Sequence, residues 1–451
     1  MTQHHPLPKG WYLTPLSSVG KWGSGGTPTR TNPKYYDNGT IPWLVIGDLN
    51  EGYIKTATTF ITEDGLENSS AKLLQEGTLL VAMYGSIGKT GITALPCATN
   101  QAIAHCTPNE GINLHYLHRA IQNIKPNLIS LGKGGTQQNI SQTILKDQKI
   151  PLAPINEQHR IADKLDRVLA RVDAANEHLS RVAPLIKRFR QSVLAAATSG
   201  QLTEDWRGNK LQEWKFERAD AICSKVQSGG TPKAGFSPQG IPFLKVYNIV
   251  NQRIDFDYKP QFVAQEVHEG ELKKSITLPD DVLMNIVGPP LGKVAIVSNT
   301  SPSWNINQAI TLFRPSERIL SKWIYIVLCE GAPIRSVLKS TKGSVGQVNI
   351  SLSQCRAFSI PVPSIEEQSE IVRRVEKLFA FADRLEERLS EAQAAVQKLT
   401  PALLAKAFRG ELVPQDPNDE PARELLKRLQ ESRADSAKPS RARKPRTRKS
   451  P

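Results

Sequence analysis

The sequence predicts an α/β protein in the broad sense, with two similar domains of mixed α+β structure and one long helix after each domain. Three observations support this prediction. Blocks of residues recur in the same order in both halves, short apolar runs are separated by glycine and proline, and two long segments carry a heptad pattern. The length of 451 residues agrees with this organisation, because such a chain exceeds one ordinary core.

The repeat begins with the pentapeptide SGGTP, which occupies residues 24–28 and again residues 228–232. Five further pairs of blocks follow in order: IPW (41–43) and IPF (241–243), GSIGK (85–89) and GPPLGK (288–293), NQAI (100–103) and NQAI (307–310), QNIS (138–141) and VNIS (348–351), IPLAPINEQ (150–158) and IPVPSIEEQ (360–368). The offset drifts only between 200 and 210 residues, as loop insertions would produce. A unit of this length is too long for a solenoid repeat and indicates a tandem duplication of whole domains.

Each unit has two parts of different character. Apolar runs such as TLLVAMY (78–84) and AIVS (295–298), bounded by glycine and proline, favour strands in the first part, and a helical pattern follows the PINEQ-type block. The predicted boundaries are a first domain at 1–152, a helical region at 153–205, a second domain at 206–362, a helical region at 363–412, and a short helix with a basic, disordered tail at 413–451.

Both helical regions carry a heptad seam, in which apolar residues recur at alternating steps of three and four. The first seam is Ile161, Leu165, Val168, Val172, Ala175, Leu179, Val182, Ile186, Phe189 and Val193. The second is Ile371, Val375, Leu378, Ala382, Leu385, Leu389, Ala392, Val396, Leu399 and Leu403. Ser364 and Glu367 predict a capping box at the start of the second helix, and Gly200 and Gly410 mark the helix ends.

Two matched seams favour pairing of the two helices with each other, although each helix could instead pack only on its own domain. A helix over about forty residues is about 60 Å long at 1.5 Å per residue. If the helices pair antiparallel, we expect the two domains at opposite ends of a rigid strut. Two DNA-binding domains held in this way would meet duplex DNA one or two helical turns apart.

The net charge of +15 favours a polyanionic partner. The segment KPSRARKPRTRKSP (438–451) contributes seven basic residues, which leaves 15 − 7 = +8 for the remainder. A body that stays basic without its tail favours nucleic acid as the partner. Five scattered cysteines predict reduced thiols, and the lack of a signal peptide or membrane span in this sequence makes the cytoplasm the expected location.

The two domains with their NIS…IPLAPINEQ and NIS…IPVPSIEEQ blocks, and the segment AFRGELVPQDPNDEPA (407–422), resemble the specificity subunit of type I restriction–modification enzymes. The resemblance implies two target recognition domains, each reading one half of a split DNA sequence. It also implies helices that set the spacer and dock two modification (methyltransferase) subunits, with restriction (translocase–nuclease) subunits joining later. The chain would be a non-catalytic reader that binds no cofactor, while S-adenosylmethionine, ATP and magnesium serve the partners in adenine methylation or restriction.

The two domains differ between their shared blocks, so a bipartite and asymmetric DNA target is expected. The loop after the first SGGTP is basic and aromatic, which suits phosphate and base-edge contacts, and an arginine there suits a bidentate guanine contact. Its candidates are Arg30, Lys34, Tyr35 and Tyr36, and those of the second domain are Lys233, Lys245 and Asn248. A solvated loop is the alternative interpretation.

The shared glycine turns supply further candidates. The backbone N–H groups of GGTP and the hydroxyls of Thr27 and Thr231 suit phosphate, as do Lys89 and Lys293, although these turns could simply connect strands. The loops GKGGTQQN (132–139) and TKGSVGQVN (341–349) combine lysine with side chains able to contact bases, and glutamine pairs well with adenine. Their candidates are Lys133, Thr136, Gln137, Gln138, Lys342, Ser344 and Gln347, whereas Asn139 and Asn349 could cap local backbone.

Motifs for catalysis are incomplete in this sequence. MYGSIGKT (83–90) lacks the first glycine of a phosphate-binding P-loop, and NPKYY (32–36) departs from the Asn-Pro-Pro-Tyr motif of amino-methyltransferases at Lys34. His115 and His118 lack a third metal ligand nearby. The alternatives to a specificity subunit with restriction partners are a methylation-only system, a self-sufficient DNA-modifying enzyme, and a coiled-coil adaptor for proteins.

Overall fold

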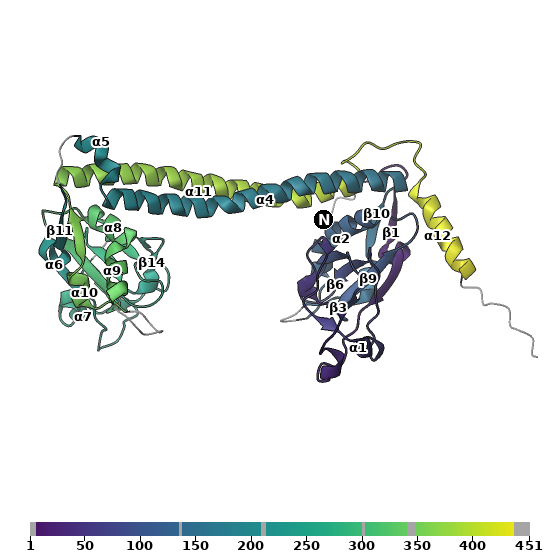
Figure 1. Ribbon diagram of the computed structural model, residues 1–451, viewed down its shortest axis with the longest axis horizontal. Coiled ribbons are helices and arrows are strands. Elements are labelled where there is room, and N and C mark those ends of the chain that lie inside the picture. The colour runs from purple at the N-terminus through teal and green to yellow at the C-terminus, as the bar shows by residue number, and fades with distance from the viewer. Residues whose placement is uncertain (1–5, 135–137, 209–212, 300–302, 341–348, 437–451) are drawn as a thin grey trace, which may run out of the picture. The chain divides into compact units, whose positions relative to one another are not determined.

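The computed structural model describes residues 6–134, 138–208, 213–299, 303–340 and 349–436 (Figure 1). The chain divides into two compact units. The first unit comprises residues 1–178 and 392–451, and the second comprises residues 179–391. Each long helix therefore contributes one part to each unit.

The first unit is built on a five-stranded sheet with the order β2-β9-β6-β7-β4. Its strands are β2 (Gly20–Ser24), β9 (Ile103–Pro108), β6 (Leu79–Ala82), β7 (Thr90–Thr93) and β4 (Tyr53–Ile54). A second sheet contains β5 (Phe60–Ile61), β3 (Ile41–Leu44) and β8 (Ala98–Thr99), and a third pairs β1 (Tyr12–Pro15) with β10 (Lys149–Leu152). The helices are α1 (Glu63–Glu67), α2 (Leu114–Ser130), α3 (Gln142–Asp147) and the start of α4 (Ile155–Thr198). The run TLLVAMY forms β6 as expected, and all four residues of that strand are buried.

The second unit repeats this framework. Its main sheet has the order β12-β20-β17-β18, with β12 (Cys223–Ser228), β20 (Ile310–Pro315), β17 (Val282–Asn285) and β18 (Val294–Ile296). One smaller sheet contains β16 (Phe262–Val263), β13 (Ile241–Leu244) and β19 (Asn305–Ile306). A second pairs β14 (Ile249–Val250) with β15 (Arg253–Ile254), and a third pairs β11 (Lys215–Arg218) with β21 (Ser359–Val362). Its helices are α5 (Glu204–Arg207), α6 (Ala219–Ile222), α7 (Gln265–Glu269), α8 (Ser321–Glu330), α9 (Ala332–Ser340), α10 (Leu352–Arg356) and the start of α11 (Ile365–Phe408). The predicted duplication of a mixed α+β domain is confirmed.

The long helices pack against each other within each unit. In the first unit, Ile161 and Leu165 of α4 share a core with Leu404 and Phe408 of α11. In the second unit, late residues of α4 meet early residues of α11: Ile186 packs with Ala382 and Leu389, and Val193 shares a core with Ile371 and Val375. The helices therefore run antiparallel. Each helix packs both on the other helix and on a domain, because the same cores include residues of the domains.

The predicted seam holds along most of both helices. Val172 is also buried, and Val168, Leu179, Leu378, Leu385 and Val396 are half-buried. The prediction is wrong at Leu399, which is 44% exposed. The last two turns of α11 lie against the first domain, so their buried face moves to Leu404, Ala407 and Phe408.

The repeated Glu-Gln pair explains why the PINEQ and IEEQ blocks begin the long helices. Gln158 accepts a hydrogen bond from the Asn113 N–H at 3.0 Å, and its amide donates to the Ala153 carbonyl at 2.9 Å. Gln368 likewise accepts from the Leu320 N–H and donates to the Pro363 carbonyl, both at 2.9 Å. Each glutamine is fully buried and fixes its helix to the domain before it.

The glutamate of each pair accepts a hydrogen bond from a tryptophan near the start of the domain. Trp11 donates to Glu157 at 2.9 Å, and Trp214 donates to Glu367 at 3.0 Å. Glu367 also accepts a hydrogen bond from the Thr203 hydroxyl at 2.8 Å. Its carboxylate therefore binds Trp214 and Thr203 and not the backbone at the helix start, so this half of the predicted capping box is wrong. Ser364 caps this helix by accepting from the Glu367 N–H at 3.2 Å.

The segment after α11 closes the first unit. Asp419 accepts hydrogen bonds from Asn156 at 3.1 Å and from Arg160 at 2.7 Å, both at the start of α4. Helix α12 (Ala422–Ser436) then places Ala422, Leu425 and Leu426 in the core of the first domain. The basic tail at 438–451 lies outside the described residues. The five cysteines are free thiols, as predicted, and no helix in the described part of the chain is long and apolar enough to span a membrane.

Candidate nucleic-acid interface

Four of the repeated blocks meet at one end of the main sheet in the first unit. SGGTP follows β2, GSIGK follows β6, and NQAI precedes β9. Backbone hydrogen bonds join them: the Gly26 N–H donates to Thr99, Met83 donates to Ala102, and Gly85 donates to the Gln138 carbonyl, at 2.8–3.0 Å. The QNIS block therefore joins the other three in one continuous surface of loops.

The second unit assembles the same four blocks at the same end of its main sheet. The Gly230 N–H donates to the Ile306 carbonyl at 3.1 Å, and Ile286 donates to Ala309 at 2.8 Å. The Ile350 N–H, in the VNIS block, donates to the Ile286 carbonyl at 2.9 Å. We call this surface the loop end of each domain, defined by the SGGTP, GSIGK or GPPLGK, NQAI, and QNIS or VNIS blocks.

Close backbone contact explains the repeated glycines of SGGTP. A β-carbon on Gly25 would lie 2.0 Å from the Thr99 carbonyl oxygen, and one on Gly229 would lie 2.0 Å from the Ile306 carbonyl oxygen. No other residue fits there without moving the backbone. The N–H groups of Gly25 and Gly26 donate to Ile103 and Thr99, so the predicted phosphate contact from these N–H groups is wrong.

The threonine of SGGTP is paired with the glutamine of NQAI in both units. Thr27 donates its hydroxyl hydrogen to the Gln101 side-chain oxygen, and Thr231 donates to Gln308 at 2.5 Å. Both glutamines are exposed. Sequence reasoning proposed the two threonines but missed the two glutamines, although the repetition of NQAI was a visible signal.

The two predicted lysines of the glycine turns occupy equivalent places. The Lys89 ammonium donates to the Ile46 carbonyl at 3.4 Å, and the Lys293 ammonium donates to the Val246 carbonyl at 3.5 Å. Both lysines are half-buried. In the first unit a cleft of about 380 Å³ opens beside Lys89, and Lys125, Ser86 and Gln138 also line it.

A partly buried polar network lines this cleft and extends from it into the domain. Glu51 accepts hydrogen bonds from Thr90 at 2.6 Å, from Lys125 at 2.6 Å and from Gln122 at 3.1 Å, and Thr90 contacts His118 at 2.9 Å. Burial alone would raise the pKa of Glu51, but these donors outweigh it and lower the pKa. His118 is 2% exposed and belongs to this network, whereas His115 is half-buried.

Acidification is expected to destabilise the first domain through His118. Burial lowers the pKa of His118 to about 3, against about 6.5 in an unfolded chain. Below pH 6.5 the unfolded chain binds a proton that the folded chain excludes, so stability present at neutral pH is lost as pH falls toward 3. Between pH 7.5 and 5 we expect a loss of about 2 kcal/mol in the free energy of unfolding. Urea titrations at both pH values test this, and the same loss in His118→Gln would contradict it.

The residues that differ between the domains flank the loop end. Arg30 and Lys34 are exposed and Tyr35 is half-buried. Tyr36 donates its hydroxyl hydrogen to the Pro28 carbonyl at 2.7 Å and packs edge-on against Trp43, so its first function is to hold the loop. A contact of Tyr36 with DNA stays a prediction.

The second domain has different chemistry at the corresponding place. Phe236 packs edge-on against Phe243, and the Lys245 ammonium lies 4.6 Å from the centre of the Phe236 ring. Lys233 is exposed. The prediction for Asn248 is wrong, because this side chain is 1% exposed and bonds to the Lys245 N–H and the Asp255 and Tyr258 carbonyls.

The glutamine-rich loop of the first domain is closed by two backbone hydrogen bonds between Lys133 and Asn139, both at 2.9 Å. Lys133 and Gln138 are exposed at this base. The remaining candidates of these loops lie outside the described residues; they are Thr136, Gln137, Lys342, Ser344 and Gln347.

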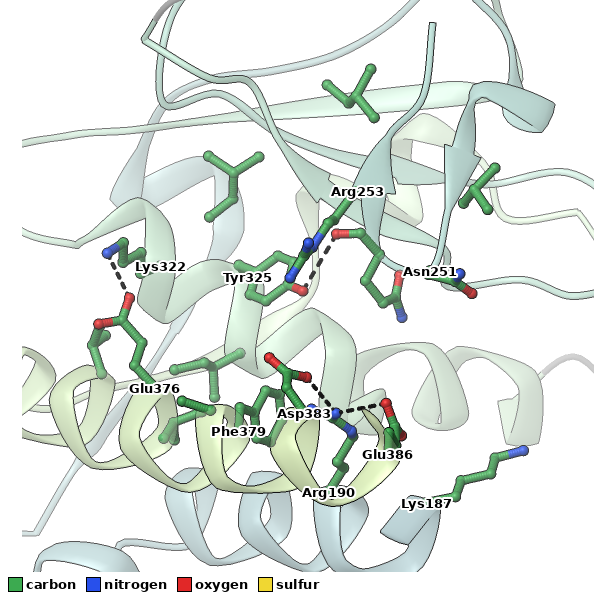
Figure 2. A pocket seen from close by; sticks show the side chains of 18 of the residues that line it. Lys187, Arg190, Asn251, Arg253, Lys322, Tyr325, Glu376, Phe379, Asp383 and Glu386 are labelled. Atoms are coloured by element: carbon green, nitrogen blue, oxygen red, sulfur yellow. Dashed lines mark hydrogen bonds and ion pairs between the residues drawn. The ribbon is translucent and has the colours of Figure 1, made fainter. Parts of the chain in front are cut away.

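A separate cleft of about 1110 Å³ lies in the second unit between α8, the β14–β15 hairpin and the long helices (Figure 2). Lys322 of α8 pairs with Glu376 at 2.6 Å, and Arg190 pairs with Asp383 at 2.6 Å. Its lining includes none of the loop-end residues, so we assign it to the junction of domain and helices.

The first unit has different residues at the equivalent junction. His115 of α2 lies 3.0 Å from Asp166 of α4 and 2.9 Å from the Tyr53 hydroxyl. Lys322 and Arg253 stand at the positions of His115 and Tyr53 in the second unit, where Lys322 makes the equivalent ion pair with Glu376 at 2.6 Å.

Comparison with known proteins gives one consistent result. The model of the type I restriction modification DNA specificity domain matches residues 8–182 and 212–392. The EcoKI specificity subunit of Escherichia coli K12 is 28% identical over 91% of this chain and 90% of its own length. The EcoBI specificity subunit of Escherichia coli is 31% identical over 75% of this chain and 74% of its own.

Solved structures show the same fold. A chain from a study of complex assembly in a type I R-M system matches with a TM-score of 0.67 at 18% identity, over 90% of this chain and all of that one. The HsdS subunit of Thermoanaerobacter tengcongensis matches with a TM-score of 0.57 at 19% identity, over 91% of this chain and all of its own. At these identities the likeness concerns the fold.

Proposed function

The chain belongs to the family of type I restriction–modification DNA specificity subunits, and from this premise we propose that each domain binds one half of a bipartite, asymmetric DNA target. In this proposal the domains at 1–152 and 206–362 are the two target recognition domains. The helical regions at 153–205 and 363–412 set the spacer between the half-sites.

The loop end carries this proposal. Both domains present the same four blocks there, on the same strands, and surround them with different side chains. Shared residues suit the DNA backbone, which is alike in both half-sites, and divergent residues suit the bases. Different side chains flank the two loop ends: Arg30 and Lys34 in the first domain, and Lys233 with the Lys245–Phe236 contact in the second. These side chains would favour different bases.

We further propose that the chain performs no chemistry itself. Among the described residues, no group of three or more metal-ligating side chains is present, and the five thiols have pKa values raised to about 12 by burial. Two modification subunits would supply adenine methylation with S-adenosylmethionine, and restriction subunits would supply ATP- and magnesium-dependent cleavage. The helices α4 and α11 and the junctions at their ends are the proposed docking region for the modification subunits.

Selection from a random duplex library tests the proposal. The purified chain, in complex with the modification subunits of its own system, is expected to enrich two short sequences separated by a spacer of constant length. Affinity is expected to fall steeply with salt, because phosphate contacts release counterions. Enrichment of one continuous sequence, or of none, would reject the proposal.

A further inference from the structure

One exposed side-chain pair is the same in both domains although the surrounding residues differ. Thr27 with Gln101, and Thr231 with Gln308, join the SGGTP block to the NQAI block in each loop end. Tyr36 and Trp43 donate hydrogen bonds to the Pro28 and Gly26 carbonyls beside the first pair, whereas the residue that follows SGGTP is Thr29 in the first domain and Lys233 in the second. A pair kept identical beside such different neighbours indicates a contact that both half-sites share.

The chemistry of the pair defines what it can bind. The threonine hydroxyl donates its single hydrogen to the glutamine oxygen, so the glutamine nitrogen keeps two N–H donors. Among the described residues, neither Gln101 nor Gln308 has another hydrogen-bond partner for these donors. The threonine bond fixes the orientation of the amide, so the two donors are presented in advance of binding.

Phosphate oxygens are acceptors only, whereas base edges in the major groove mix donors and acceptors in a sequence-dependent order. Both domains present the same fixed, neutral pair of donors. Such a pair suits the DNA phosphate, because every half-site contains phosphate groups whatever its base sequence. Resting on the proposed function, the geometry points to the Thr27–Gln101 and Thr231–Gln308 pairs as equivalent clamps on the DNA phosphate backbone. They position each domain on the duplex and do not select bases.

The ordinary alternative is that each pair only joins two loops. The backbone bonds from Gly25 to Ile103 and from Gly26 to Thr99 already join the same loops in the first unit, so the side-chain pair is not needed for that connection. Loss of the glutamine amide is therefore expected to leave folding intact and to reduce binding.

Substitution of the glutamines in the complete complex with modification subunits tests the inference. Gln101→Ala and Gln308→Ala are each expected to weaken binding of the selected duplex about tenfold, as for one hydrogen bond to a charged acceptor. The ranking of duplexes with altered bases in either half-site should not change. Gln75→Ala, at an exposed position before β6 and outside both the loop end and the long helices, is the matched control and should bind like the unaltered chain.

The threonine variants give a second readout. Thr27→Ser keeps the hydroxyl and should keep full affinity, whereas Thr27→Val releases the amide and should weaken binding to a similar extent as Gln101→Ala. A duplex with a neutral methylphosphonate at one phosphate of the first half-site should remove the difference between the unaltered chain and Gln101→Ala. Melting temperatures of all variants should stay within a few degrees.

Three results would overturn the inference. They are unchanged affinity in both glutamine variants, a changed base preference in either half-site, and affinity loss that follows only a loss of melting temperature. A different result would reject the proposed function itself: the unaltered complex would show no sequence preference at all.

Discussion

Replacing Ile186 with alanine is expected to lower the free energy of unfolding by about 2–5 kcal/mol. Ile186 lies in the seam of α4, is 4% exposed, and packs against Ala382 and Leu389 of α11. Truncation to alanine removes apolar contact and leaves a cavity that neighbouring side chains fill only partly. Urea titration followed by circular dichroism of the helices measures the loss.

The adjacent residue provides the control. Leu185 is 53% exposed on the same helix, so Leu185→Ala is expected to change stability by no more than about 0.5 kcal/mol. Equal effects at the two positions, or a larger effect at Leu185, would show that the predicted seam is not the packed face of α4.

Replacing Glu367 with alanine is expected to cost about 3–5 kcal/mol, as for other buried charges that lose their partner. Glu367 is 3% exposed, accepts hydrogen bonds from Trp214 and Thr203, and lies 3.2 Å from the Arg207 guanidinium. Its removal leaves a buried indole N–H and a half-buried cation without their acceptor. Calorimetric melting of the purified chain measures the effect.

Glu376→Ala, on the same helix, is the matched control for Glu367. Glu376 forms its ion pair with Lys322 at an exposed place, and such pairs contribute at most about 1 kcal/mol. Similar losses for the two variants would contradict the assignment of Glu367 as the anchor between α11 and the second domain.

The helical regions were predictable because their signal is local. Apolar spacing of three and four residues is set by helix geometry, so the seam from Ile161 to Val193 and from Ile371 to Val396 follows from the sequence. The prediction is wrong at Leu399, because the end of α11 packs on the first domain and a different face of the helix is buried there. Tertiary packing of that kind leaves no local signal.

The loop end was predictable only in part, because its contacts join residues far apart in the sequence. Repetition drew attention to SGGTP and NQAI separately, but the bond between Thr27 and Gln101 spans 74 residues and appears only in the fold. Residue type alone also misplaced Asn248 and the Glu367 half of the capping box. A polar side chain in a loop and one that supports the loop from within have the same sequence signature.

Mapping of methylated adenines across the genome tests the central claim most directly. Cells would carry either the unaltered chain or a chimera whose residues 213–362 come from the corresponding domain of a related specificity subunit. We expect a split motif that is absent without the gene, and a chimera that changes one half of that motif while the other half and its adenine stay the same. A motif that changes in both halves, or in neither, would contradict two independent DNA-reading domains.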